Sequence, residues 1–104
     1  MKHFQLLTTD PEALEDAGLH KAAGIKDFGL YRKFDERGFA QNVYVFFVEA
    51  NCNKGRVTIA FFDKDDAMRP INSKRNMETT FLEEEQAKII KGLAEAGIIG
   101  EEIE

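Results

Sequence analysis

The sequence predicts a two-layer α+β domain, with an antiparallel sheet of three to five strands and two helices packed mainly on one face. Three observations carry this prediction. The most apolar run, Phe39–Phe62, has the pattern of a β-hairpin, and a helix-start signal stands on either side of it, at Thr9–Glu12 and at Thr80–Glu83. The expected order is β-α-β-β-β-α in one domain over residues 1–104, with a frayed acidic tail at 100–104.

Two strand patterns define the central hairpin. Val43–Val48 is β-branched and aromatic throughout, and both of its alternating residue sets are apolar, which is typical of a strand in the middle of a sheet. In Arg56–Phe62 only Val57, Ile59 and Phe61 form a clean apolar set. The turn residues Asn51–Gly55 lie between the two strands.

An upstream strand is used to decide which face of the sheet is the core. A turn at Asp35–Gly38 would align Phe28, Leu30 and Phe34 with Val43, Val45 and Phe47, and a three- or five-residue loop around Asn53 would add Val57, Ile59 and Phe61. We take this set as the core face. The second face then carries the following residues: Tyr31, Lys33, Tyr44, Phe46, Val48, Arg56, Thr58 and Phe62.

The N-terminal region predicts a short edge strand over residues 3–9, followed by a helix. Asp10 is a suitable cap and Pro11 suits the first helical position. Gly18 is one candidate end of this helix. Continuation to Ala23, with Gly24 as the stop, is slightly favoured.

The C-terminal region predicts the clearest helix. Thr80–Glu83 matches a capping box, and the helix is expected to end near Gly97. Its apolar stripe consists of Leu82, Gln86, Ile89, Ile90, Leu93 and Gly97. The preceding segment, 63–80, is long for a connection, and residues 75–79 fit a short edge strand. Whether this segment covers the second sheet face stays open.

Composition favours a soluble globular protein. The chain has 104 residues, of which 43% are hydrophobic and 32% charged, with a net charge of −5. The net negative charge belongs to residues 78–104, which hold eight acidic and two basic residues, whereas residues 1–77 are close to neutral. Cys52 is the single cysteine, which excludes an internal disulfide and makes the cytoplasm the expected compartment. No apolar run approaches the roughly 20 residues that span a bilayer.

Catalytic signals are weak. Asp63, Asp65 and Asp66 follow a strand end, where carboxylates can bind a hard cation, and a metal-dependent enzyme at these residues is the third hypothesis. The chain has no phosphate-binding glycine loop and no nucleophile elbow. We therefore expect no enzyme activity, no cofactor and no metal site.

Protein contact is the leading functional hypothesis. The chain has too few helices to cover both faces of an apolar strand, so one face is expected to remain available as a contact surface. The partner is a protein, with a second copy of the chain as one candidate. The expected contact residues are Tyr31, Tyr44, Phe46, Val48, Arg56 and Phe62.

Single-stranded nucleic acid is the alternative partner for the same face. Aromatic rings there would stack on bases, and basic residues would contact phosphates. The candidate phosphate contacts are Lys33, Lys54, Lys64, Arg69, Lys74 and Arg75. The acidic overall balance argues against non-specific binding of this kind.

Overall fold

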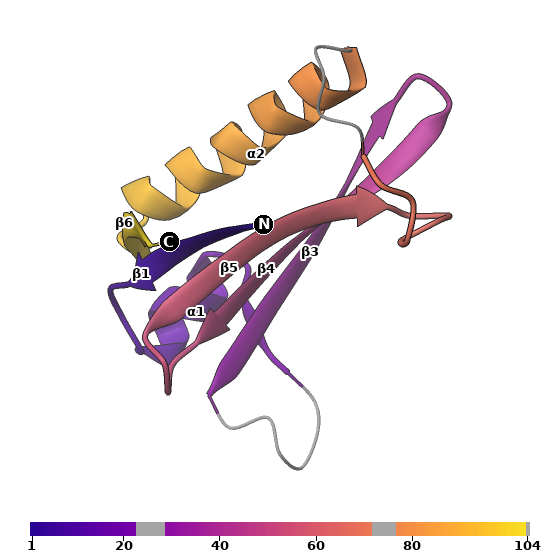
Figure 1. Cartoon of the computed structure of the whole chain (residues 1–104). Coiled ribbons are helices and arrows are strands. Elements are labelled where there is room, and N and C mark those ends of the chain that lie inside the picture. Colours follow the sequence, from indigo (N-terminus) through magenta and orange to yellow (C-terminus); the bar gives the residue numbers. More distant parts are fainter. Residues whose placement is uncertain (23–28, 72–76, 104) are drawn as a thin grey trace.

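The computed structural model describes residues 1–22, 29–71 and 77–103, which form two helices and one antiparallel sheet (Figure 1). The elements are β1 (Lys2–Leu6), α1 (Pro11–Asp16), β2 (His20–Lys21), β3 (Leu30–Phe39), β4 (Asn42–Asn51), β5 (Arg56–Asp63), α2 (Met77–Glu95) and β6 (Ile99–Ile103). The strand order across the sheet is β2-β3-β4-β5-β1-β6.

The α+β class with an antiparallel sheet is confirmed, but the described part of the sheet has six strands rather than three to five. The predicted frayed tail is wrong up to Ile103, because β6 pairs with β1. The strand predicted at the N-terminal edge is also misplaced. β1 lies inside the sheet, between β5 and β6.

α1 begins with the cap that the sequence predicts, whereas the predicted capping box Thr80–Glu83 lies inside α2, and the limits of both helices differ from the prediction. Asp10 caps α1 by accepting the N–H of Glu12 at 3.2 Å, and Pro11 is the first helical residue. The longer form of this helix is wrong, since α1 ends at Asp16 and Gly18 follows with φ of +89°. α2 begins at Met77, one turn before the predicted start. Residues 77–79 are therefore helical rather than an edge strand, and residues 75–76 lie outside the described residues.

The register of the sheet reverses the predicted core face. β3 runs on to Phe39 and turns at residues 40–41, so Phe34 lies opposite Phe47, on the face we expected for both. The loop between β4 and β5 is the source of the error. Asn51 pairs with Arg56, which leaves a four-residue loop instead of three or five, and Ile59 therefore lies opposite Val48. The core face is therefore the one that carries Tyr44, Phe46 and Val48, together with Val57 and Ile59 of β5.

The Asn51 side chain explains the loop length. Its Oδ1 accepts the N–H groups of Asn53 and Lys54, each at 3.1 Å, which closes a tight turn at the end of β4. Gly55 then takes φ of +64°, a conformation that favours glycine, before β5 begins. The local chemistry of this turn thus decides which side chains of β5 share a face of the sheet with which side chains of β4.

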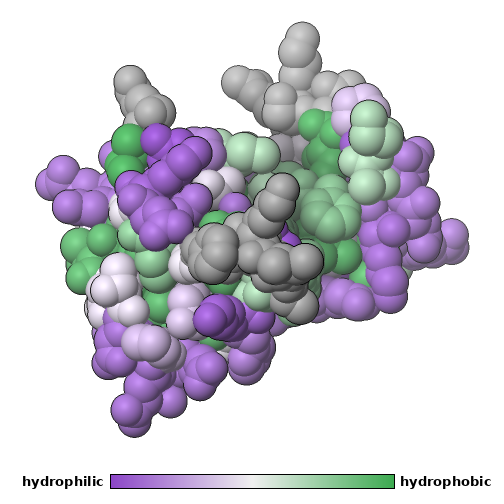
Figure 2. All heavy atoms as spheres, turned by 90° about the horizontal axis from the view of Figure 1, so that it is seen from below, coloured by the Kyte–Doolittle hydropathy of each residue, from purple (hydrophilic) through white to green (hydrophobic). Residues whose placement is uncertain are grey.

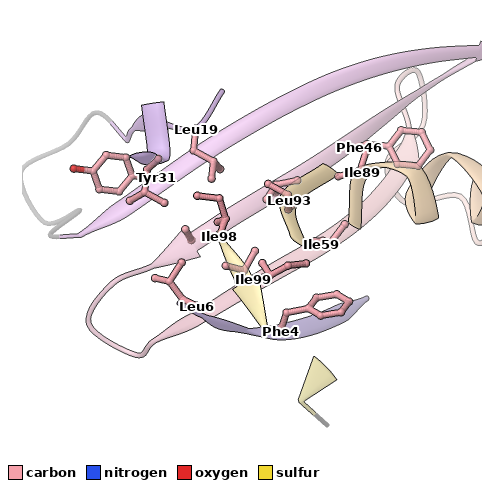
Figure 3. Close-up of a cluster of buried hydrophobic side chains, with 14 of the residues drawn as sticks. Phe4, Leu6, Leu19, Tyr31, Phe46, Ile59, Ile89, Leu93, Ile98 and Ile99 are labelled. Atoms are coloured by element: carbon pink, nitrogen blue, oxygen red, sulfur yellow. The ribbon is translucent and has the colours of Figure 1, made fainter. Parts of the chain in front are cut away.

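One hydrophobic core lies between this sheet face and the helices (Figure 3). In the close-up Phe46 of β4 lies next to Ile89 of α2, while Leu19 lies close to Tyr31 at the other end of the core. The predicted stripe of α2 is confirmed in its main members, because Leu82, Gln86, Ile89 and Leu93 are buried. β6 adds Ile99 to the same core.

Both helices lie on the core side of the sheet. A hollow of about 390 Å³ is lined jointly by Ala17 at the end of α1, by Lys33 and Arg37 of β3, and by Ile89 of α2. Arg37 and Tyr44 lie opposite each other, so this hollow is on the face that carries Tyr44. Neither helix is long and apolar enough to cross a membrane.

Candidate protein-contact surface

The sheet has a second face that no described helix covers. Cross-strand pairing arranges its side chains in rows that run across the strands. One row contains Phe34, Phe47 and Ala60, and the next contains Glu36, Val45 and Phe62. We call Phe34, Val45, Phe47, Ala60 and Phe62 the open-face patch.

Aromatic rings form the centre of the open-face patch. Phe34 has 60% of its surface exposed, and it is the one aromatic residue among the described large hydrophobic side chains that is exposed. Its ring lies 5.1 Å from that of Phe47, centroid to centroid, at an interplanar angle of 43°. Phe47 and Phe62 are half-buried, and Val45 is buried, with 9% of its surface exposed. Figure 2, which views the molecule from below, shows a green hydrophobic area right of centre with purple residues around it.

Ion pairs border the open-face patch. Arg32 donates from Nε to Glu49 at 2.8 Å, and Lys64 donates to Glu36 at 3.0 Å. Arg32 of β3 and Glu49 of β4 are cross-strand partners on the uncovered face. Glu36 lies on the same face of β3, and Lys64 directly follows the end of β5. Such exposed pairs contribute little to stability, about 0–1 kcal/mol. They also affect the electrostatics of the surface, because each pair neutralises charge at the border of the apolar patch.

Four of the six predicted partner-binding residues lie on the wrong face. Tyr44, Phe46 and Val48 have no exposed surface, and Tyr31 is buried at 8% exposure. The reversed register is the cause, since it turns this set toward the helices. Arg56 is exposed on the uncovered face, and Phe62 belongs to the open-face patch.

The residues that sequence reasoning missed are Phe34, Val45 and Phe47, which were assigned to the core. One signal for them was present in the sequence. Asn51 is suited to close a four-residue loop, and that loop would have placed Val57, Ile59 and Phe61 beside Tyr44, Phe46 and Val48.

The predicted phosphate contacts do not gather on one surface. Lys33 lies on the covered side, where its Nζ is 3.5 Å from the carboxylate of Asp35. Lys64 and Arg69 are held in ion pairs with carboxylates. Lys54 is exposed in the turn between β4 and β5. Lys74 and Arg75 lie outside the described residues.

Asp63, the first residue of the predicted metal cluster, has both carboxylate oxygens occupied. Oδ1 accepts the N–H groups of Asp65 at 2.9 Å and Asp66 at 3.2 Å, and Oδ2 accepts from Arg69 Nε at 3.1 Å. Among the described residues, no group of three or more His, Cys, Asp or Glu side chains is arranged to hold a metal ion. Asp63 instead anchors the loop that follows β5.

Arg69 links that loop to the end of the core. Its Nη2 donates to Glu78 of α2 at 2.8 Å and lies 3.0 Å from Asp63 Oδ2, while the hydroxyl of Tyr44 donates to Glu78. Asp63 and Tyr44 are cross-strand partners on the core face. The side chain of Lys64 lies at the border of the open-face patch, where it pairs with Glu36. Arg69 and Ile71, further along the described part of segment 63–80, lie on the covered side.

The four members of this network shift one another's pKa values. Burial, and then the Glu78 carboxylate, raise the pKa of Tyr44. Hydrogen bonds from Arg69 and from Tyr44 lower the pKa of Glu78. Burial alone would raise the pKa of Asp63, but the N–H of Asp65 and the guanidinium of Arg69 bring it below its ordinary value. These groups are paired with one another, so we interpret the network as structural: it joins the end of β5, the following loop and the start of α2.

Cys52 lies in the turn between β4 and β5 and is half-buried. Burial raises the pKa of its thiol, which disfavours the reactive thiolate. Comparisons of this chain with protein-family models, with curated proteins and with solved structures found no match.

Proposed function

We propose that this chain is a small non-enzymatic binding module that acts through protein contact at the open-face patch. One observation carries the proposal: Phe34 is 60% exposed and rests against Phe47 on a sheet face that the described helices leave uncovered. Exposed apolar patches of a few hundred Å² are typical of interaction sites. Aromatic residues are also enriched at the cores of protein interfaces.

The charges around the patch indicate the kind of partner. Its centre has no charged side chain, and the ion pairs Arg32–Glu49 and Lys64–Glu36 neutralise its border. A partner surface that is strongly acidic or basic would gain little from this arrangement. We therefore expect a protein partner that presents an apolar patch with low net charge.

The same charges weigh against single-stranded nucleic acid. Lys64 and Arg69 are already paired with carboxylates, and Lys33 lies on the other side of the sheet. Arg56 remains as an exposed base on the uncovered face. A labelled single-stranded oligonucleotide at low salt is expected not to bind. Binding that falls steeply with salt and is lost in Arg56→Ala would favour the nucleic-acid alternative.

The test uses a photoreactive side chain at Phe62, inside the open-face patch, and at Glu84, which is exposed on α2. Cross-linking to one protein is expected from position 62 and not from position 84. The captured protein is then purified and its Kd for this chain is measured. Phe47→Glu should weaken that Kd by more than about a hundredfold, because a desolvated hot spot costs about 3 kcal/mol or more when it is lost.

Met68→Glu is the matched control, since Met68 is 90% exposed and lies outside the patch. It should leave the Kd unchanged. Equal cross-linking from positions 62 and 84, or a Kd that Phe47→Glu does not change in a folded variant, would contradict the proposal. A cross-link between two copies from position 62 would identify the partner as the chain itself.

A further inference from the structure

The outer edge of β3, which faces away from β4, is paired over only part of its length in the described residues. β3 has ten residues, and β2 pairs only with Tyr31 and Arg32. Beyond Arg32, residues 33–39 have no strand partner on that side among the described residues. Figure 1 shows β3 at the margin of the sheet, as far as the turn that joins it to β4.

The backbone groups that point outward from this edge can be identified. Ala22 N–H donates to the carbonyl of Leu30 at 2.9 Å, so the backbone of Leu30 faces β2. Backbone direction alternates along a strand, and Phe34, Glu36 and Gly38 therefore also face outward. Among the described residues, the carbonyl of Glu36 accepts an exposed hydrogen bond from Arg37 Nη1 at 3.1 Å. An added antiparallel strand would form hydrogen bonds with these three residues.

We propose that the occupant of this edge is β3 of a second copy, paired antiparallel about a two-fold axis at Glu36. This inference goes beyond the proposed function, because it uses the strand edge rather than the sheet face. It holds whether or not the open-face patch binds another protein. The result is one continuous sheet in which two open-face patches lie side by side.

Charge complementarity selects this register. With the axis at Glu36, Asp35 lies opposite Arg37 of the second copy, and Phe34 lies opposite its Gly38. An axis at Asp35 would instead place Lys33 opposite Arg37 and Asp35 opposite Asp35, so that only like charges meet. An axis at Phe34 would need Arg32, which β2 already occupies.

Two contacts in the chosen register need separate consideration. The two Glu36 side chains meet, but each is already neutralised by Lys64 at 3.0 Å. Phe34 would cover Gly38 of the second copy, and an aromatic ring over a cross-strand glycine offsets the low stability that glycine gives to a strand. It would also bury part of the most exposed aromatic surface in the described residues.

The edge also has room for the turn that β3 of the second copy must make. An open hollow of about 750 Å³ lies beside β3 just past the end of β2, lined among others by His20, Lys21, Arg32 and Phe34. In the proposed register, Phe39 of the second copy lies opposite Lys33. The β3–β4 turn of that copy would therefore enter this hollow.

The opposite edge of the sheet lacks this complementarity. β6 is five residues long and carries Glu101 and Glu102. Two copies of β6 would bring acidic side chains together, which is a common way to block an edge. In β3 the alternating signs of Lys33, Asp35 and Arg37 bring opposite charges together across the strands when the two-fold axis lies at Glu36.

The first test compares Glu36→Pro with Glu36→Gln by sedimentation equilibrium over a concentration series. Both variants remove the carboxylate, but only proline removes the outward N–H, and proline is tolerated at such edge positions. Wild type and Glu36→Gln are expected to form dimers. Glu36→Pro should raise the dimer dissociation constant by about tenfold or more, because two hydrogen bonds are lost at the axis.

Phe47→Glu separates this edge from the sheet face in the same measurement. It alters the open-face patch without touching the outward groups of β3, so the dimer should persist. A wild type that is monomeric throughout, or a folded Glu36→Pro that dimerises like Glu36→Gln, overturns the inference. Loss of the dimer in Phe47→Glu alone would assign self-association to the open-face patch and also overturn it.

A second test stays informative if Glu36→Pro fails to fold. In Asp35→Arg and in Arg37→Asp, each alone, residues 35 and 37 carry the same charge, and each variant should be mainly monomeric. Mixed together, the two variants restore both opposite-charge pairs and should form a heterodimer. A mixture that sediments as the two separate variants contradicts the proposed register.

Discussion

The two faces of β4 carry similar residues, but one face is covered by the helices and the other is not. Tyr44, Phe46 and Val48 have no exposed surface and pack under the helices. Val45 and Phe47 face the other way, into the open-face patch. Hydrophobicity alone does not separate the two sets, because both are apolar and both contain aromatic residues.

What separates them is the neighbouring strand. β5 supplies Val57 and Ile59, both fully buried, and Phe61 beside the first set, and it supplies Thr58, Ala60 and the half-buried Phe62 beside the second. Val57, Ile59 and Phe61 give the helices an apolar surface to pack against, whereas Thr58 and Ala60 break the apolar surface on the other face. The face of β4 that becomes the core is therefore chosen by its partner strand.

The largest expected effect contrasts Phe46→Ala with Phe47→Ala. Phe46 is fully buried, and its truncation should lower the free energy of unfolding by about 3–5 kcal/mol. Phe47 is half-buried, and its truncation should cost less than about 1.5 kcal/mol. Urea denaturation of both variants measures the difference. Equal losses would mean that the two faces are equally covered in solution.

A smaller effect is expected from acid, and it should come from the covered side. The pKa values of Glu78 and Asp63 are lower in the folded chain than in the unfolded chain, so the unfolded state binds more protons at low pH. Their stabilising contribution is complete above about pH 5 and is lost as pH falls through the lowered pKa values. Thermal unfolding at a series of pH values should show Tm falling in this window.

Arg69→Met and Arg32→Met sharpen the acid measurement. Arg69 causes much of the shift in both carboxylates, and its loss should flatten the dependence of Tm on pH. Arg32 belongs to an exposed ion pair with Glu49 on the uncovered face, so its loss should leave the dependence as in wild type. An Arg69→Met variant with an unchanged pH profile would show that the network does not stabilise the fold.

The smallest expected effect is that of Phe34→Ser. Phe34 is 60% exposed and contacts Phe47 at the surface, so the free energy of unfolding should change by less than about 1 kcal/mol. Chemical denaturation measures this change. A loss as large as that of Phe46→Ala would place Phe34 inside the folding core rather than on a contact surface.

Much of the fold could be predicted from local signals. The cap at Asp10, the first helical residue Pro11 and the buried stripe of α2 follow from short-range spacing. β6 could not be predicted in this way. Its residues include adjacent glutamates and form a strand because β1 offers an edge to pair with. Pairing between the two ends of the chain leaves no local pattern.

The sequence predicted that one face of the sheet would lack a helix, but it assigned most of the wrong residues to that face. One apolar sheet face without a helix above it was expected, and such a face is present in the described structure. Of the six residues assigned to it, Arg56 and Phe62 lie there, whereas Tyr44 and the others are buried. The error entered at one loop, because residues 52–55 number four, and an even loop reverses every side chain of β5 relative to β4.

By itself, the sequence determined the class of the fold, the central hairpin and the start of the first helix. These depend on contacts between residues close together in the chain. Only the tertiary structure decided which side of β4 is buried and which strand closes each edge of the sheet. Those choices depend on the pairing of distant segments, and when both sides of a strand are apolar, packing against β5 and α2 selects between them.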